Sequence, residues 1–491
     1  MIVRRFFEPL VAQTSYLIGC AECSEALIID PNRDVKHYIT AAEQEHLRIT
    51  HVTETHIHAD FVSGARELAH RTGATLHLSD EGDRDWKYQY IDPPATGDRS
   101  AAKNDANVPH VNGRLIRHGD RIELGNVRVD VVHTPGHTPE HLTFLITDGA
   151  AADQPIAAVT GDFIFVGDVG RPDLLERAAN IKGTMDASAR TLWHSLRDFA
   201  RRDDWLQIWP GHGAGSACGK GISAIPHSTL GYERRFNWAF QVTDEDEFVT
   251  KVLAGQPEAP KYFATMKRVN KEGPALLGRF RTPARLNDHA LLDLLDRKAL
   301  IIDTRPATEY AAKFVPGTFN IPLNSTFVTW AGWLIPYTSD IYLIVDEATT
   351  ARMTEVVRAL ALIGLDRVAG ILGPTAIAHA ADHGAALGTV AQVTANELAP
   401  RVAAHGVTVL DVRNAAEFAE GHIPSSLHIP LGHLSDRLKE VPNDKPVVVQ
   451  CHSGARSQIG ASLLKKYGRD DVVNLVGGLE AWEEQGLPLE R

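Results

Sequence analysis

Histidine and aspartate alternate in the segment "THIHAD", where His56, His58 and Asp60 occupy every second position. This H-x-H-x-D spacing is typical of metal-binding loops, because imidazole nitrogens and carboxylate oxygens are good ligands for zinc and iron. The next residue, Phe61, has no ligand atom. The segment therefore predicts a metal site, and Phe61 raises the question of how many metal ions the site holds.

Three later segments carry ligands of the same types. They are "HTPGHT" with His137, "TGD" with Asp162 and "PGHG" with His212. Apolar stretches that we expect to form strands precede "HTPGHT" and "TGD", and in α/β enzymes functional side chains gather in the loops at strand ends. Four such segments in one chain predict a metal site much more strongly than a lone H-x-H would.

A second centre of chemistry is predicted in "VVVQCHSGARS", where Cys451 directly follows an apolar strand and precedes a helical run. Backbone N–H groups of a strand-to-helix turn and the dipole of the following helix stabilise a thiolate and an anion bound to it. Arg456 adds a full positive charge. A small buried cysteine of the core is the alternative, but Ser453 and Gly454 in a loop oppose it. The predicted loop around the persulfide consists of His452, Ser453, Gly454 and Ala455.

The elements around Cys451 occur twice in the chain. "LIIDTRPATEYAAKFVPGTFNIPL" matches "TVLDVRNAAEFAEGHIPSSLHIPL" at a constant offset of 108 positions, which indicates a duplicated domain. The matched pairs are Asp303 and Asp411, Arg305 and Arg413, and Glu309 and Glu417. We interpret Asp411 and Arg413 as a structural ion pair. The first copy carries Asp346 where the second carries the cysteine, so one copy lacks a nucleophile.

Length and composition place these segments in a multidomain globular chain. The 491 residues are too many for one ordinary core, and 44% hydrophobic and 23% charged residues are typical of globular proteins. We expect an N-terminal domain over 1–245, a helical connector over 246–280, and two domains of parallel α/β type over 281–386 and 387–491.

Charge and cysteine usage exclude several classes of protein. The net charge of −12 opposes general binding to nucleic acid, and four cysteines make no disulfide framework. The start of the chain has no signal-peptide pattern, and no apolar run is long enough to span a membrane. These features predict a cytoplasmic protein. The polar stretch 79–118 predicts a long surface loop, and we expect its Trp86, Tyr88 and Tyr90 to form a lid or an oligomer contact. A partly ordered insertion is the alternative.

The C-terminal copy resembles the rhodanese (sulfurtransferase) family in "DVRNAAEFAEGHIPSSLHIP" and "CHSGARS". The resemblance covers 387–491 and implies that Cys451 carries a persulfide sulfur between a donor and an acceptor. The copy over 281–386 resembles an inactive rhodanese, because Asp346 cannot hold transferable sulfur. It implies a structural or docking role for this copy, and a partner-binding role for the repeats stays an alternative.

The order of the N-terminal motifs resembles the metallo-β-lactamase superfamily, which implies an αββα sandwich. "TGDFIFVGDVGRPDLL" resembles its persulfide dioxygenase branch. That resemblance implies one Fe(II) per chain, held by His56, His137 and Asp162. It places three further residues in a supporting role around the metal: His58, Asp60 and His212. Phe61 would exclude a second metal, and zinc is the alternative cofactor.

"GHGAGSACGK" resembles the fused persulfide dioxygenase–sulfurtransferases of bacterial sulfide detoxification, and this implies that Cys218 relays sulfane sulfur near the iron. A small residue in a glycine-rich loop is the alternative. The fusion implies oxidation of glutathione, coenzyme A or cysteine persulfide by O₂ to sulfite, with Cys451 interconverting sulfite and thiosulfate in either direction. We expect a homo-oligomer. The alternative is a glyoxalase II-like zinc thioester hydrolase with accessory rhodanese domains.

Overall fold

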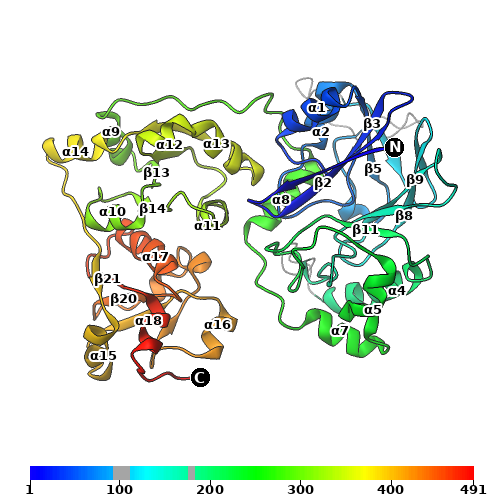
Figure 1. The fold of residues 1–491 in the computed structure, drawn as a ribbon. Helices are drawn as coiled ribbons and strands as arrows, with labels where there is room; N and C mark the ends of the chain where they lie inside the picture. The colour runs from blue at the N-terminus through cyan, green and yellow to red at the C-terminus, as the bar shows by residue number, and fades with distance from the viewer. Residues whose placement is uncertain (92–110, 175–182) are drawn as a thin grey trace. The chain divides into compact units, whose positions relative to one another are not determined.

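The fold is that of a computed structural model, which describes residues 1–91, 111–174 and 183–491. The chain is mixed α/β and forms two compact units (Figure 1). The first unit comprises Met1–Arg279 with Ala361–Gly364, and the second comprises Phe280–Leu360 with Leu365–Arg491. Each unit has its own sheets and its own buried core.

The first unit contains two six-stranded sheets. In the first sheet the strands follow chain order, antiparallel from β1 to β3 and parallel from β3 to β6. Its strands are β1 (Ile2–Glu8), β2 (Gln13–Cys20), β3 (Glu25–Ile29), β4 (Arg48–Thr53), β5 (Thr75–Ser79) and β6 (Gly113–Ile116).

The second sheet of this unit has the order β12-β11-β10-β9-β8-β7. All of its neighbours are antiparallel except β10 and β11. Its strands are β7 (Arg121–Leu124), β8 (Val127–His133), β9 (Leu142–Asp148), β10 (Ala157–Gly161), β11 (Gln207–Pro210) and β12 (Ser228–Thr229).

The two sheets pack face to face, and helices cover their outer faces. The central core joins Ile18 and Leu27 of the first sheet to Val129 and Phe144 of the second, all fully buried. Leu68 of a helix packs in a separate core on the outer side of the first sheet. Strands with two buried faces read as continuous apolar runs, as "EALII" does. The predicted αββα sandwich is confirmed.

The helices of the first unit fall in the outer layers and near the site. The α2 helix ends at Gly73, whose φ of 72° is left-handed, as expected for glycine after a helix. The helices are α1 (Val35–Gln44), α2 (Ala65–Thr72), η1 (Arg84–Trp86), α4 (Met185–Phe199), α5 (Leu230–Phe236), α6 (Trp238–Gln241), α7 (Glu245–Leu253) and α8 (Tyr262–Glu272).

The stretch predicted as a helical connector, 246–280, contains most of α7 and all of α8. Asp244 caps α7 by accepting a hydrogen bond from the backbone N–H of Glu247. Phe248 of α7 packs on Trp193 of α4, with 5.2 Å between their ring centroids. Both α7 and α8 therefore belong to the first unit. The domain boundaries that the sequence suggested stay predictions.

The prediction of a surface loop over 79–118 is wrong for the part that the structure describes. Trp86 and Tyr88 are buried in the core beneath the first sheet, and β6 adds a parallel strand to that sheet. The segment as a whole is polar and rich in glycine, and this average composition does not reveal the few aromatic side chains that are buried. The remainder of the predicted loop, 92–110, lies outside the described residues.

The second unit contains two parallel sheets, one for each copy of the repeat. Their orders are β14-β13-β15-β16 and β17-β21-β20-β18-β19. The strands are β13 (Leu300–Asp303), β14 (Phe319–Asn320), β15 (Ile341–Ile344), β16 (Val368–Leu372), β17 (Ala391–Val393), β18 (Thr408–Asp411), β19 (Leu427–His428), β20 (Val447–Gln450) and β21 (Val472–Leu475). The prediction that each copy forms a parallel α/β sheet is confirmed.

Helices connect these parallel strands. They are α9 (Ala290–Asp296), α10 (Ala307–Ala312), α11 (Phe327–Leu334), α12 (Glu347–Ala351), α13 (Met353–Leu362), α14 (Thr375–Asp382), α15 (Ala395–Ala403), α16 (Ala415–Glu420), η2 (Leu431–His433), η3 (Leu438–Glu440), α17 (Ala455–Lys466) and α18 (Gly478–Glu484). Across the described parts of the chain, no helix has both the length and the apolar character that crossing a membrane requires.

Candidate metal centre and sulfur-transfer loop

The loops after three strands of the first unit bring the predicted metal ligands together. His56 follows β4, His137 follows β8 and Asp162 follows β10. All three side chains are buried, and the ligand atoms that they offer lie within 4.8 Å of one another. The fold thus brings three distant sequence segments together, so that two imidazoles and one carboxylate form a single cluster.

Hydrogen bonds orient both imidazoles toward the carboxylate. The backbone carbonyl of Arg171 lies 3.0 Å from His137 Nδ1, so this nitrogen donates and Nε2 carries the lone pair. His137 Nε2 then lies 3.5 Å from Asp162 Oδ2. On His56, the Thr55 hydroxyl contacts Nδ1 at 2.9 Å. A hydrogen bond from the second ring nitrogen to a carbonyl is typical of metal-ligating histidines.

The Asp162 carboxylate shows that the site fits a cation. Both of its oxygens are buried and have no hydrogen-bond partner. A buried carboxylate without compensation is costly, so it requires a nearby positive charge. Burial is the main cause that lowers the pKa of both His56 and His137, and in His56 the neighbouring imidazoles lower it further. Neutral imidazoles beside an orphaned carboxylate are the donor set that a divalent metal requires.

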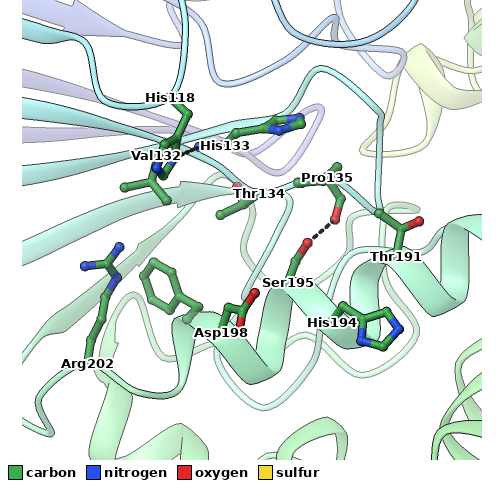
Figure 2. Close-up of a pocket in the computed structure, with 11 residues that line it drawn as sticks. His118, Val132, His133, Thr134, Pro135, Thr191, His194, Ser195, Asp198 and Arg202 are labelled. Carbon is green, nitrogen blue, oxygen red and sulfur yellow. Dashed lines mark hydrogen bonds between the residues drawn. The ribbon is translucent and has the colours of Figure 1, made fainter.

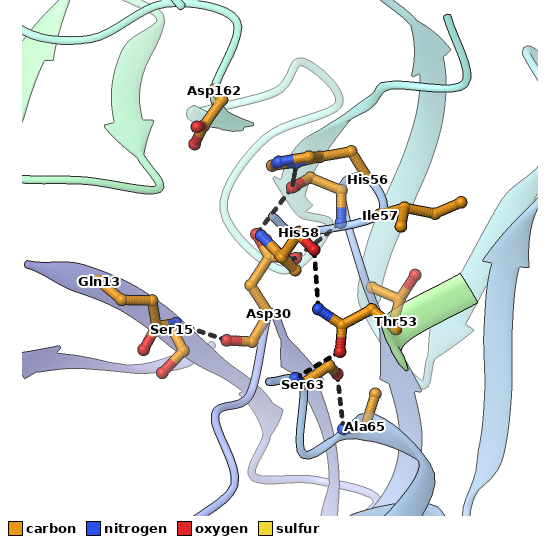
Figure 3. Close-up of polar contacts among 12 residues, drawn as sticks. Gln13, Ser15, Asp30, Thr53, His56, Ile57, His58, Ser63, Ala65 and Asp162 are labelled. Atoms are coloured by element: carbon orange, nitrogen blue, oxygen red, sulfur yellow. Dashed lines mark hydrogen bonds and ion pairs between the residues drawn. The ribbon is translucent and has the colours of Figure 1, made fainter. Parts of the chain in front are cut away.

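His58 faces away from this cluster and toward Asp30 (Figure 3). Its Nε2 lies 3.1 Å from Asp30 Oδ1, and Thr55 donates to the same carboxylate through its N–H and its hydroxyl. Burial opposes protonation of His58, but the negative charge of Asp30, with that of Glu54, raises the pKa of His58 to about 9. His58 therefore stabilises the ligand loop as part of a buried ion pair.

Asp60, His212 and Cys218 form a second buried group whose ligand atoms lie within 4.8 Å of one another. His212 Nδ1 contacts the carbonyl of Ala12 at 3.0 Å. Its Nε2 lies 3.3 Å from Asp60 Oδ2 and 3.4 Å from Asp162 Oδ1. Asp162 thus stands between the two groups, with one oxygen toward each.

Phe61 lies beside the ligand loop as a fully buried side chain. Its ring centroid is 4.4 Å from that of His58. The position where a further ligand would extend the second group therefore holds an apolar ring that packs on the supporting histidine.

Cys218 is buried next to the carboxylates of both groups. Burial raises the pKa of its thiol well above the ordinary value, and the negative charges of Asp162 and Asp60 raise it further. Its backbone N–H donates to the Ser216 hydroxyl at 3.1 Å. The sulfur is placed where the prediction required it, and it stays a neutral thiol unless a cation offsets the two carboxylates.

In the second unit, Cys451 follows β20 directly and lies in the turn before α17. The backbone N–H of Gly454 donates to Cys451 Sγ at 3.1 Å, and the Ser457 hydroxyl lies 3.5 Å from the sulfur. Gly454 has a φ of 95°, a left-handed conformation that favours glycine. The predicted loop therefore has the geometry that stabilises a negative charge on sulfur.

Arg456 is held by an ion pair with Glu417 of α16. Two guanidinium nitrogens lie 2.7 Å and 2.5 Å from the two carboxylate oxygens. Burial opposes ionisation of Glu417, but the hydrogen bonds and charge of Arg456 outweigh it and lower the pKa of Glu417. The positive charge of Arg456 near Cys451 is thus partly neutralised by Glu417, a residue that the sequence did not indicate as part of the site.

Comparison with known proteins agrees with this geometry. The family model of the metallo-beta-lactamase superfamily matches residues 9–212, and that of the rhodanese-like domain matches residues 394–485. A crystal structure of a metallo-beta-lactamase from Staphylococcus aureus is 39% identical, covers 76% of this chain and 99% of its own, and superposes with a TM-score of 0.64. The chain belongs to the metallo-beta-lactamase superfamily. Its C-terminal part is a rhodanese-like domain.

Two curated relatives match separate parts of this metallo-beta-lactamase–rhodanese chain. A sulfurtransferase of Allochromatium vinosum is 39% identical over 101 residues, which are 20% of this chain and 94% of the relative. A beta-lactamase hydrolase-like protein of Xylella fastidiosa is 28% identical over 262 residues, which are 50% of this chain. The chain spans about half (54%) of the length of that second relative. The two domains together indicate an enzyme of sulfur metabolism.

Two residues that position the superfamily's metal centre escaped the sequence analysis. Asp30 ends the apolar run of β3 and holds His58, so an aspartate directly after a buried strand was the available signal. His141 accepts a hydrogen bond from the backbone N–H of Asp162 at 3.1 Å, and its Nδ1 contacts Thr134 at 2.9 Å. No motif in the sequence singles out His141, although it lies four positions after His137.

The α8 helix also contributes to the site, which its sequence does not indicate. Asn270 donates from its amide nitrogen to the carbonyls of His58 and Phe61 at 2.8 Å each, and its amide oxygen accepts from the backbone N–H of Ser63 at 2.9 Å. Burial raises the pKa of Tyr262, and the negative charge of Asp60 adds to the rise. A helix 200 residues downstream in the chain therefore fixes the ligand loop.

A separate surface pocket of about 400 Å³ lies between the end of β8 and α4 (Figure 2). Ser195 of α4 donates to the carbonyl of Pro135 at 2.7 Å across its floor. His133 and Thr134 belong to the "HTPGHT" segment and line it, but none of the described residues that we propose as metal ligands does. This pocket is therefore distinct from the metal centre.

Proposed function

We propose that the chain is a non-heme Fe(II) persulfide dioxygenase fused to a thiosulfate sulfurtransferase. The first unit oxidises a low-molecular-weight persulfide with O₂, and the second passes a further sulfur atom through Cys451. The observation that carries the proposal is the cluster of His56, His137 and Asp162. Two histidines and one carboxylate with open positions are the ligand set of non-heme iron oxygenases.

The metal would supply the redox chemistry with O₂, and the protein supplies position and environment. His141 holds the backbone of Asp162, and Arg171 fixes the ring of His137. The Asp30–His58 ion pair keeps the loop of His56 in place. Burial of every member of the cluster excludes bulk water and strengthens these electrostatic contacts.

The proposed oxidation balances without a further reductant. A persulfide RSSH, O₂ and water give RSH, sulfite and two protons, so the sulfane sulfur loses four electrons and O₂ gains four. Cys218 lies beside Asp60 and Asp162 and would hold or relay sulfane sulfur at this site. Glutathione, coenzyme A and cysteine persulfides all fit this chemistry.

The rhodanese step follows from the loop of Cys451. The Cys451 thiolate takes the outer sulfur from a second RSSH, which releases RSH and leaves a cysteine persulfide. Sulfite then attacks that outer sulfur, forms thiosulfate and regenerates the thiolate. Gly454 and the N-terminus of α17 stabilise negative charge on the sulfur throughout. Sulfur transfer in the reverse direction, from thiosulfate to a thiol, uses the same groups.

Assembly of the chain as a homo-oligomer stays a prediction.

A second candidate function is a glyoxalase II-like zinc thioester hydrolase. The observation that favours it is the group of Asp60, His212 and Cys218, which offers a second set of ligand atoms on the other side of Asp162. Two metals that share an aspartate would fit a hydrolase better than an oxygenase. Phe61 opposes this candidate because it occupies a ligand position with an apolar ring.

Oxygen uptake with glutathione persulfide, measured beside metal analysis, separates the two candidates. We expect iron in the purified protein and oxygen consumption that depends on the persulfide. Asp162→Asn should abolish both, whereas Asp153→Asn, at an exposed position, should leave both unchanged. Zinc as the bound metal, thioester cleavage and no oxygen uptake after iron supplementation would contradict the dioxygenase proposal.

The number of metal ions per chain provides an independent test. We expect one ion in the wild-type metal centre and two in Phe61→His, because the new imidazole would join Asp60 and His212. Two ions in the wild-type centre would show that Phe61 does not exclude the second metal.

A further inference from the structure

Three histidines meet on the surface of the first rhodanese-like copy, the copy that lacks the transfer cysteine. His289 is the residue before α9, His379 lies in the last turn of α14, and His383 directly follows that helix. The ligand atoms that they offer lie within 4.8 Å of one another. His289 and His383 are exposed and His379 is half-buried, so the cluster is open to solvent.

The hydrogen bonds within the cluster leave lone pairs on its inner side. His383 Nδ1 lies 2.9 Å from the carbonyl of His379, and a carbonyl only accepts, so Nδ1 carries the proton and Nε2 is free. His379 Nε2 and His289 Nδ1 lie 2.9 Å apart and share one proton. A tautomer shift moves that proton to an outer nitrogen and frees both inner lone pairs, with no change in net charge.

The two helices that carry the cluster are fixed against each other by the core. Leu291 and Leu294 of α9 pack with Ala376, Ile377 and Ala380 of α14 in one buried cluster. The histidines therefore start from a nearly fixed spacing, and rotation about the side-chain bonds is enough to bring the nitrogens to a common point. Such preorganisation lowers the entropy cost of binding.

Charge around the cluster also favours a cation. Desolvation and the neighbouring imidazoles of His383 and His289 lower the pKa of His379, and the acidic side chains of Asp288 and Asp382 act in the opposite direction. Three imidazoles beside two acidic side chains form a donor set for a divalent metal.

We propose that His289, His379 and His383 form a binding site for a borderline-soft divalent cation, with Zn²⁺ as the ion that the donor set fits best. Zinc takes imidazole nitrogens at about 2.0–2.1 Å in tetrahedral geometry. Three imidazoles fill three positions and leave a fourth for water or for an acidic group of another molecule. The site gives the cysteine-free copy a ligand of its own, independent of the sulfur chemistry of Cys451 and of the iron centre.

Calorimetric titration of the full-length, iron-loaded protein with Zn²⁺ tests this site. We expect His379→Ala/His383→Ala to bind one Zn²⁺ fewer per chain than the wild type, with iron content unchanged. The control His405→Asn removes an exposed histidine in a left-handed turn, where asparagine is tolerated, and should bind Zn²⁺ like the wild type. Equal Zn²⁺ stoichiometry and affinity in the wild type and the double variant would overturn the proposal.

A single, milder substitution tests the same site in case the double variant does not fold. His383→Gln keeps the size and polarity of the side chain after α14 and removes one ligand nitrogen. We expect it to weaken the same binding event. Unchanged zinc affinity in His383→Gln would also overturn the proposal.

Discussion

The two rhodanese-like copies share a buried ion pair and differ in the turn that carries the cysteine in the second copy. In the first copy Arg305 binds Asp303, with a shortest separation of 2.6 Å, and in the second Arg413 binds Asp411 at 2.7 Å. Both pairs are buried at the end of the equivalent strands β13 and β18. The predicted ion pair of Asp411 and Arg413 is confirmed, and the equivalent pair in the copy without the cysteine indicates that it serves the fold.

The turns after β15 and β20 show how the copies diverged. In the second copy the backbone N–H of Gly454 donates to the sulfur of Cys451. In the first, Asp346 accepts from the backbone N–H of Thr349 at 2.6 Å and caps the short helix α12. The side chain of Asp346 thus occupies the helix N-terminus that an external anion would need.

The arginine that follows each of these turns shows the same contrast. Arg456 forms a two-point ion pair with Glu417 of α16 near the cysteine. Arg352 instead pairs with Glu355, three positions further along an exposed surface. The copy without the cysteine therefore also lacks the ion pair that holds the arginine near the turn in the second copy.

The largest expected effect is the loss of sulfur transfer in Cys451→Ser. A serine hydroxyl cannot hold the transferable sulfur, so transfer from thiosulfate to cyanide should fall by roughly 10³-fold or more. A coupled assay of thiocyanate formation measures it, with Cys23→Ser as the control at a half-buried cysteine of the first unit. Retention of activity would mean that Cys451 is not the transfer residue.

The next largest effect is expected from Gly478→Ala. Gly478 has a φ of 59°, and a Cβ there would lie 2.3 Å from the carbonyl oxygen of Cys451 and 2.5 Å from that of His452. The transfer loop must shift, and a displacement of about 1 Å at a reacting group costs on the order of 10²-fold in rate. Thiocyanate formation measures the effect.

Gly468→Ala provides the matched control for this substitution. Gly468 also has a left-handed φ, 85°, but nothing lies within 4 Å of a Cβ there. Both variants should lose about 1–2 kcal/mol of stability from the backbone conformation. Equal sulfurtransferase activity in the two variants would contradict the proposed role of the loop position.

A smaller effect is expected from Glu417→Gln. Glutamine keeps the helix cap that Glu417 makes with Asn414 but removes the charge that holds Arg456. Transfer should change by about tenfold or less, which corresponds to about 1.4 kcal/mol. Glu309→Gln, at the equivalent exposed position of the first copy, should change nothing, and an equal effect of both variants would remove Glu417 from the site.

The smallest effect on sulfur transfer is expected from Asp346→Cys. The new thiol would place a nucleophile in the first copy, but it would lack the arginine–glutamate pair beside Cys451, because Arg352 binds Glu355 instead. Loss of the helix cap should cost about 1 kcal/mol in the free energy of unfolding, measured by urea denaturation. Restored sulfur transfer in Asp346→Cys/Cys451→Ser would show that the cysteine alone separates the two copies.

The sequence predicted the parts of these sites that depend on local spacing. His56, His137 and Asp162 each follow an apolar strand, so their convergence follows from the sheet. The repeat and the Asp411–Arg413 pair were also predictable from the sequence, because a fixed offset of 108 positions aligns the two copies. Local pattern was sufficient wherever a ligand and its strand are adjacent in the chain.

Residues whose role depends on distant neighbours were not predictable from one sequence. Asn270 reaches the ligand loop from a helix more than 200 positions away, and Glu417 meets Arg456 only through the parallel sheet. Trp86 is an apolar anchor within a polar stretch, so its burial was missed. In each case the contact forms only through tertiary packing. No periodic pattern in the sequence therefore predicts which residues meet.

The product that the full-length protein makes from glutathione persulfide and O₂ tests the coupling of the two units most directly. We predict that the wild type forms thiosulfate, and that Cys451→Ser consumes oxygen at the same rate but accumulates sulfite. Thiosulfate in unchanged yield from Cys451→Ser, with oxygen uptake intact, would contradict the proposal that sulfite from the first unit is consumed at Cys451.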